Sequence, residues 1–328
     1  MSKIEKTIAR QQQRIKDGDF YEAHQQLRVI SARYIKQDNF DAAIDILSSG
    51  AKALLEAGQG GSGGDLCLLL LDTYGKAETT PDAQSKARLL SLVRAFPSGE
   101  VTRKRFVNEM IAWSAKHGEF PAGDPELHHV AGSLYASEDE PYEAEKHLIL
   151  GTQDSPEILV KLEYDWYLED DSHTAPLYAA RAILPYLLTG NLRAANKSLL
   201  LFTSKLGQSS QNLGVQEVSS KLSDLRVYPS IPLLNFLGLL LLAVQRGSAD
   251  LYRQLRSHFQ VHLKDVPAWN EALNEIGQMY FGIKVPSQSN PLFDMMGSML
   301  MGGRGGGGAA KKGGKGPGTP ALGAPGVD

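Results

Sequence analysis

The sequence predicts an all-α protein, an α-solenoid of about fourteen antiparallel helices. Apolar residues recur every three or four positions from residue 3 to residue 282, which is the spacing of amphipathic helices. The breaks between these segments are short, and no convincing polar–apolar alternation indicates a strand. A local pattern also recurs along the chain. Stacked helical hairpins extend by adding neighbours, which explains how 328 residues form one body.

The first three helices have the clearest boundaries. Asp17-Gly18-Asp19 separates the first two, and Gln37-Asp38-Asn39 separates the next two. Gly ends a helix readily and Asp or Asn caps the following one, so stop and start signals coincide. Connections this short make neighbouring helices antiparallel. The buried stripes are Ile4, Ile8 and Ile15; Ala23, Leu27, Ile30 and Tyr34; and Ala43, Leu47, Ala51 and Leu54.

The recurring pattern is a turn residue, an apolar or ring residue, and then Ala and Leu one helical turn apart. It resembles a degenerate tetratricopeptide-type hairpin, in which the small Ala lets a neighbouring helix approach closely. Four ordinary amphipathic helices that start alike are the alternative. The four copies are Gly18, Phe20, Ala23 and Leu27; Asp38, Phe40, Ala43 and Leu47; Asp139, Pro141, Ala144 and Leu148; and Gly190, Leu192, Ala195 and Leu199.

Two stretches interrupt the helices. Gly58–Gly64 formally contains GxGxxG, but a helix rather than a strand precedes it, so we expect a flexible, hinge-like loop and no nucleotide site. Gly207–Pro229 predicts one long irregular loop or small hairpin near the C-terminal end. Apolar residues recur within it, which suggests docking against a partner or, equally, packing on the chain's own solenoid.

Composition excludes several classes of protein. Residues 302–328 carry four basic residues and one acidic residue, so residues 1–301 hold a net charge of about −6, unlike a nucleic-acid-binding protein. The longest apolar run, Ile231–Val244, is too short to span a bilayer. No apolar signal segment is visible at the N-terminus, and Cys67 is the one cysteine. We therefore expect a soluble cytosolic protein that does not insert into membranes.

The search for chemistry finds no enzyme signature. No P-loop or GxSxG motif occurs, and His258 and His262 stand one turn apart without the glutamate of HExxH. We expect these histidines to be solvated or partly packed, and we expect no cofactor, no metal and no catalytic residue. The function should therefore be carried by surfaces.

Three surfaces are candidates. The first is a basic stripe of Lys3, Lys6, Arg10 and Arg14 with Lys16 nearby, which could steer an acidic partner or be an ordinary solvated face. The second is the helix Ile231–Val244 with its preceding loop. It is apolar on all sides, so either a partner or the chain's own last helices must cover it. The third is the Met-rich segment Pro291–Met301, an adaptable binding surface or a helix folded back on the chain.

These pieces together resemble the Golgi-to-ER traffic protein 4 family, the α-solenoid scaffold of guided entry of tail-anchored proteins. The resemblance rests on motifs that occur in order from about residue 10 to 303. They are the segment from Gly18 to Gln25 with Arg33-Tyr34, Ser49-Gly50-Ala51, GQGGSGGDL at Gly58–Leu66, Gly123–His128, Tyr142–Glu145, Leu150-Gly151-Thr152, LNFLGLLLLAV, Ile276-Gly277-Gln278 and MMGSMLMGG.

The resemblance implies a non-catalytic bridge. Its N-terminal helices would bind the homodimeric ATPase that carries tail-anchored proteins, through Lys6, Arg10, Arg14 and Lys16. Asp65 and Asp72, at the start of the fourth helix, would make a second, regulatory contact. Its C-terminal half would bind a ubiquitin-like-domain partner, which recruits a co-chaperone holding the client. The residues expected at that second site are Val215, Val218, Leu225, Tyr228, Leu233, Phe236, Leu237 and Leu240.

The chain then divides into three parts. We expect residues 1–150 to form the ATPase-binding half of the solenoid and residues 151–301 the half that binds the ubiquitin-like partner. Residues 302–328 would be a disordered, Gly-rich basic tail. The alternative is a generic helical-repeat scaffold or co-chaperone, similar to a proteasome-lid subunit, without an ATPase partner.

Overall fold

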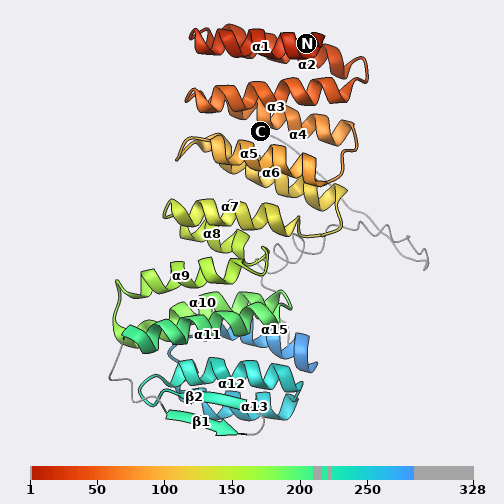
Figure 1. Cartoon of the computed structure of the whole chain (residues 1–328). Helices are drawn as coiled ribbons and strands as arrows, with labels where there is room; N and C mark the ends of the chain where they lie inside the picture. The colour runs from red at the N-terminus through yellow and green to blue at the C-terminus, as the bar shows by residue number, and fades with distance from the viewer. Residues whose placement is uncertain (1, 210–215, 221–222, 284–328) are drawn as a thin grey trace, which may run out of the picture.

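The computed structural model describes residues 2–209, 216–220 and 223–283 (Figure 1). In this part of the chain it contains fifteen α-helices, one short 3₁₀ helix and one β-hairpin. The N-terminal helices are α1 (Lys3–Lys16), α2 (Phe20–Ile35), α3 (Phe40–Glu56), α4 (Gly60–Lys76), α5 (Ala83–Ala95), α6 (Val101–His117), α7 (Pro125–Ser137) and α8 (Pro141–Leu148). They are followed by α9 (Ser155–Tyr167), η1 (Ser172–Thr174), α10 (Ala175–Leu188), α11 (Leu192–Ser209), β1 (Gln216–Ser220), β2 (Ser223–Val227), α12 (Pro232–Arg246), α13 (Ala249–His258), α14 (Gln260–Leu263) and α15 (Trp269–Phe281).

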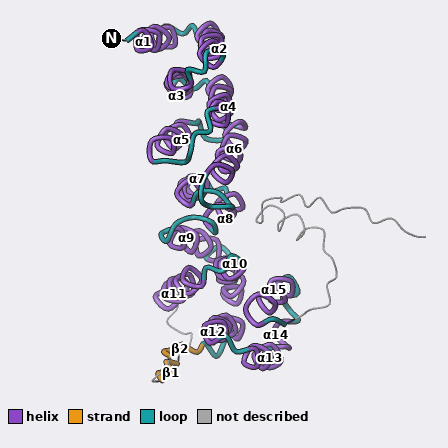
Figure 2. The backbone as a smooth tube through the Cα atoms, turned by 90° about the vertical axis from the view of Figure 1, so that its right-hand side faces the viewer, coloured by secondary structure: helices purple, strands orange, loops and turns teal. Residues whose placement is uncertain are grey.

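The helices stack as antiparallel pairs into an elongated, two-layered solenoid, as predicted. In Figure 2 the odd-numbered helices from α1 to α11 form one layer and the even-numbered helices from α2 to α10 form the other. The C-terminal helices depart from this stacking. α12 packs below α10 and α11, and α15 turns back to lie beside α10. The two ends of the solenoid are therefore different surfaces on one body.

The turn residue of the recurring pattern has the same backbone conformation in all four copies. Gly18, Asp38, Asp139 and Gly190 all have positive φ, the left-handed conformation that ends a helix. Asp is among the few side chains that tolerate this conformation. The Ala of each copy is completely buried, and the Leu is buried in three copies and half-buried in the fourth. The pattern is thus a real structural repeat.

The first four helices have a longer period than tetratricopeptide repeats. Residues 18, 38, 58 and 78 have positive φ, so successive helices end twenty residues apart. A pair of helices therefore spans about forty residues, whereas a tetratricopeptide pair spans about 34. The difference follows from helices of 14 to 17 residues joined by short turns.

The expectation of a flexible loop at Gly58–Gly64 is wrong. Helix α4 begins at Gly60, and three of its glycines are buried where other parts of the chain approach closely. A Cβ atom on Gly63 would lie 2.6 Å from Leu55 Cγ and 3.1 Å from the Leu55 backbone nitrogen, and side chains at the start of α6 similarly crowd Gly60 and Gly64. The glycine cluster is therefore a packing surface that brings α3 and α6 against α4.

Substitution of these glycines separates packing from flexibility. Gly63→Ala should lower the free energy of unfolding by about 1–3 kcal/mol, because the new methyl group overlaps Leu55. Gly61→Ala is the matched control, since no atom lies within 4 Å of its Cβ position. It should raise stability by up to about 1 kcal/mol through helix propensity. Urea unfolding followed by circular dichroism measures both, and equal effects would contradict the packing role.

Helices α7 and α8 are joined by a buried pair of histidines. His128 Nδ1 and His147 Nδ1 are 3.0 Å apart, and His128 Nε2 is 3.1 Å from the carbonyl oxygen of Ala122. His128 Nε2–H therefore donates to that carbonyl, and His147 Nδ1–H donates to His128. His147 Nε2 is buried without a hydrogen-bond partner among the described residues. Both rings are thus held neutral.

Burial lowers the pKa of both histidines, and that of His147 to about 3. Because the folded-state pKa lies below the ordinary value of about 6.5, the stabilisation is present above pH 6.5 and is lost as the pH falls below it. Protonation of His147 in the unfolded state alone should lower the free energy of unfolding by about 2 kcal/mol between pH 6.5 and pH 5. Urea midpoints at these pH values should fall more in the parent protein than in His147→Asn. An equal fall in both would contradict the assignment.

Candidate interaction surfaces

Helix α1 carries the predicted cationic stripe, which is defined here as Lys3, Lys6, Arg10 and Arg14. Ser2 and Glu5 form a capping box that fixes the start of the helix. Buried Gln11 and Ile15 face the neighbouring helices, and the Gln11 amide donates to Gln26 on α2 at 3.0 Å. This packing turns the stripe outward.

The charges of the stripe are not neutralised within the described part of the chain. Lys3, Lys6, Arg10 and the adjacent Lys16 are exposed, and Arg14 is half-buried. No carboxylate of residues 2–209, 216–220 or 223–283 forms an ion pair with any of them within 4.0 Å. An acidic partner would therefore meet a row of available cations.

Asp65 and Asp72 are both engaged by side chains of the same chain. Arg28 Nη1 donates to both Asp65 oxygens at 2.9 and 2.7 Å, and His24 Nε2 lies 2.8 Å from Oδ2. Asp72 pairs with Lys76 at 2.6 Å one turn further along α4. Since α4 begins at Gly60, Asp72 lies in its C-terminal half and not at its start as predicted. Asp65 connects α2 to α4, and Asp72 lines a groove of about 380 Å³ between α4 and α6.

The predicted irregular stretch before α12 contains a small β-hairpin. Helix α11 first continues through Gly207 to Ser209. Strands β1 and β2 then pair antiparallel, with Val218 opposite Leu225. Val215 lies outside the described residues. Asn235 on α12 fixes the exit of the hairpin, because its side chain accepts from the Tyr228 backbone N–H at 2.7 Å and donates to the Tyr228 carbonyl at 2.8 Å.

Most of the predicted partner contacts on α12 are covered by the chain itself. Phe236, Leu237 and Leu240 are buried, as is Tyr228 just before the helix. Phe236 packs against Phe259 and Trp269, with ring centroids 5.6 and 6.3 Å apart. Own-chain burial, the alternative reading of this helix, is therefore what the structure shows. Leu233 is half-buried and keeps some exposed surface.

No helix in the described ranges is long and apolar enough to cross a membrane.

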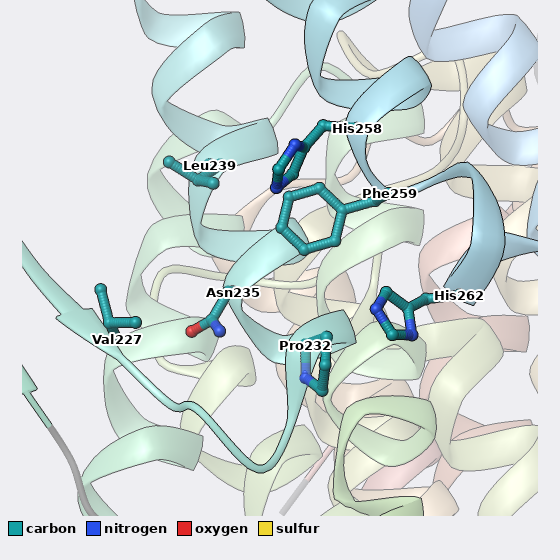
Figure 3. A pocket seen from close by; sticks show the side chains of 7 residues that line it. All are labelled: Val227, Pro232, Asn235, Leu239, His258, Phe259 and His262. Carbon is teal, nitrogen blue, oxygen red and sulfur yellow. The ribbon is translucent and has the colours of Figure 1, made fainter.

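A groove of about 320 Å³ opens where β2 meets α12, α13 and α14 (Figure 3). Phe259, Pro232 and Leu239 give it an apolar lining, and the exposed rings of His258 and His262 stand on either side of Phe259. From their spacing, these histidines were expected to be solvated or partly packed, and no binding role was predicted for them. The described residues contain no group of three His, Cys, Asp or Glu side chains that could hold a metal ion. The sequence feature that could have indicated the groove is this pair of histidine rings one helical turn apart, close in sequence to an apolar helix.

Three predicted features remain: Cys67, the Met-rich segment and the basic tail. Cys67 is completely buried, and burial raises the pKa of its thiol well above the ordinary value. The Met-rich segment Pro291–Met301 and the basic tail, residues 302–328, lie outside the described residues.

The sequence profile of Golgi to ER traffic protein 4 matches residues 37–300. The chain belongs to this family. Golgi to ER traffic protein 4 of Aspergillus fumigatus is 57% identical over 94% of this chain and 93% of its own length. The protein of that name from Schizosaccharomyces pombe is 35% identical over 90% of this chain and 95% of its own length. The crystal structure of C. therm. Get4 matches with a TM-score of 0.84 at 54% identity, covering 96% of this chain and 100% of that one.

These comparisons confirm the Golgi to ER traffic protein 4 resemblance and the solenoid fold. The profile begins after α2, so it gives no separate support to the cationic stripe. It does include the hairpin, α12 and the groove of Figure 3. The roles of individual residues stay predictions.

The Asn235 clamp should hold the hairpin in place. Asn235→Ala leaves the Tyr228 N–H and carbonyl without their side-chain partner, which should cost about 1–3 kcal/mol. Amide hydrogen exchange over residues 223–228 should accelerate accordingly. Gln245→Ala is the matched control, because Gln245 lies on the same helix as Asn235 and its side-chain amide donates to Asn196 at an exposed site. Unchanged exchange in Asn235→Ala would contradict the clamp.

Proposed function

We propose that this chain is a non-catalytic scaffold that bridges a targeting ATPase and a ubiquitin-like-domain partner. The proposal follows the family resemblance to proteins of Golgi-to-ER traffic and of tail-anchored protein insertion. The single observation that carries it is the separation of two unlike surfaces. The unneutralised cationic stripe lies at one end of the solenoid, and the apolar groove lies near the other.

At the N-terminal end, the stripe on α1 would bind acidic residues of the homodimeric ATPase. Exposed complementary charges increase the rate of encounter and fix the orientation of the partner. Asp65 is already bound by Arg28 and His24, so a cation of the ATPase that reached Asp65 would have to displace or join them. Asp72 is more accessible, because within the described ranges it forms an ion pair only with Lys76, an exposed lysine of the same helix. We therefore assign anchoring to the stripe and regulation to α4.

At the C-terminal end, the groove between β2 and α12–α14 would receive an apolar segment of the ubiquitin-like-domain partner. Pro232, Leu239 and Phe259 give the groove its apolar surface, and the buried face of α12 supports it from below. A pre-formed site loses less entropy when it binds its partner. The co-chaperone and its client would be recruited indirectly, through this partner.

The mechanism would be proximity. A scaffold that holds the ATPase at one end and the client donor near the other converts transfer between them into a local event at high effective concentration. Contact by α4 with one conformation of the ATPase could also favour the state that accepts the client. No residue of the scaffold needs to carry out chemistry in this scheme.

Charge reversal on the stripe tests the bridge. Arg10→Glu with Arg14→Glu should weaken ATPase binding at least tenfold at low salt, since the loss of a few exposed charge pairs amounts to about 1.4 kcal/mol or more. Titration calorimetry at low and moderate salt measures the change.

The matched control reverses Arg193 and Arg246, which are exposed cations outside the stripe, and should leave ATPase binding unchanged. Binding of the ubiquitin-like partner should persist in the stripe variant. ATPase affinity that is unchanged at both salt concentrations would contradict the proposal and favour a generic helical scaffold.

A further inference from the structure

A patch of aromatic and apolar side chains lies midway along the solenoid, away from both proposed partner sites. We define this central patch as Tyr142, Trp166, Leu177, Tyr178 and Arg181, from α8, α9 and α10. The Tyr142 and Trp166 rings meet edge to face at 5.9 Å, and the Arg181 guanidinium lies over both rings at 5.6 and 5.1 Å. Tyr142 is 71% exposed and Leu177 is 38% exposed, so the patch faces solvent. Tyrosine, tryptophan and arginine are the residues most enriched at binding hot spots.

Arg181 of the patch is anchored from beneath by two glutamates. Its Nε lies 3.0 Å from Glu163, which is completely buried, and it also contacts Glu145 at 2.8 Å. Burial, followed by the neighbouring Glu145, raises the pKa of Glu163 to about 9. The two carboxyl groups thus retain one proton between them at neutral pH, and Arg181 balances a single negative charge. Arg181, anchored in this way, contacts the faces of both aromatic rings.

The border of the patch is acidic. Asp165 in the last turn of α9 is exposed, as are Glu169, Asp170 and Asp171 on the segment that joins α9 to α10. Tyr178 of the patch donates to Asp170 at 3.0 Å, which connects the acidic border to the patch, whereas Asp165 pairs with Lys161 one turn before it on α9. An apolar surface with an acidic border fits a segment that is both apolar and basic.

The chain itself contains such a segment beyond the described residues. PLFDMMGSMLM at Pro291–Met301 is apolar and Met-rich, and Arg304, Lys311, Lys312 and Lys315 follow it. Methionine sulfur contacts aromatic rings favourably, and lysine binds both carboxylates and ring faces. We propose that residues 291–315 of this chain dock on its own central patch, with the methionines on the aromatic rings and the lysines at the acidic border.

The geometry brings this segment within reach. Helix α15 packs beside α10, where Tyr280 Oη donates to the Leu187 carbonyl at 2.7 Å. Leu177 is ten residues back along α10 from Leu187, about 15 Å at the rise of an α-helix. The eight residues from Lys284 to Pro291 span up to about 27 Å when extended. The linker is thus longer than the separation of Leu187 and Leu177 along the helix axis, so its length allows the Met-rich segment to reach the level of the patch.

Site-specific photocross-linking of the full chain tests this docking. Tyr142→p-benzoylphenylalanine places the cross-linker on the central patch, and Tyr21→p-benzoylphenylalanine, at an equally exposed tyrosine of α2, is the matched control. Mass spectrometry of the monomer band identifies the linked peptides. Links from position 142 should fall mainly within residues 291–315, and position 21 should give at least fivefold fewer of them. Lys311→Glu, Lys312→Glu and Lys315→Glu together should lower the yield at least threefold.

Three results would overturn the proposal. The first is cross-linking of the tail only in dimers, which would make the segment a ligand of a second copy. The second is a similar yield of tail links from positions 142 and 21, which would show unspecific collision. The third is an absence of tail links from position 142, or a yield that lysine reversal does not change. Both tyrosines are exposed, so we expect both substituted proteins to fold, and a difference in cross-linking yield then reports the position of the tail.

Discussion

The close approach of successive helices is the constraint on which the solenoid depends. A residue with positive φ follows each of the first four helices by two or three positions, and the first three connections reverse the chain within three or four residues. Such sharp reversals place the next helix directly against the last, so the facing positions must be small. Ala23 and Ala43 meet this requirement in α2 and α3, and Gly63 meets it in α4. Larger side chains at these positions would push the stack apart and break the continuity of its core.

This constraint also determines where the surfaces lie. Because each helix buries one stripe against its neighbours, its opposite face is presented at a fixed place along the stack. The cationic stripe of α1 is exposed because Gln11 and Ile15 are buried, and Tyr142 is exposed because Ala144 is buried. At the C-terminal end, α15 folds back on α10 and the last helices cover α12. That departure from simple stacking creates the groove beside Phe259.

Sequence reasoning predicted most of the fold because helical periodicity and turn chemistry are local signals. The turns at Gly18 and Asp38 and the burial of Ala43 and Leu47 could be read directly. The role of Gly63 could not, because the same glycines suit a flexible loop or a close helix contact, and only the position of Leu55 decides between them. For the same reason, periodicity showed that Phe236 had to be covered but not that Phe259 and Trp269 of the same chain cover it. The Arg28–Asp65 pair joins residues far apart in sequence, and no local pattern indicates it.

The central claim is that one chain holds two different proteins at the same time at separate places. Mass photometry of the full chain mixed with the ATPase and the ubiquitin-like-domain partner measures this most directly. We predict a species with the combined mass of all three components, which forms at the same ATPase concentration whether or not the ubiquitin-like partner is already bound. Two binary complexes that compete, with no ternary species at saturating concentrations of both partners, would contradict the account.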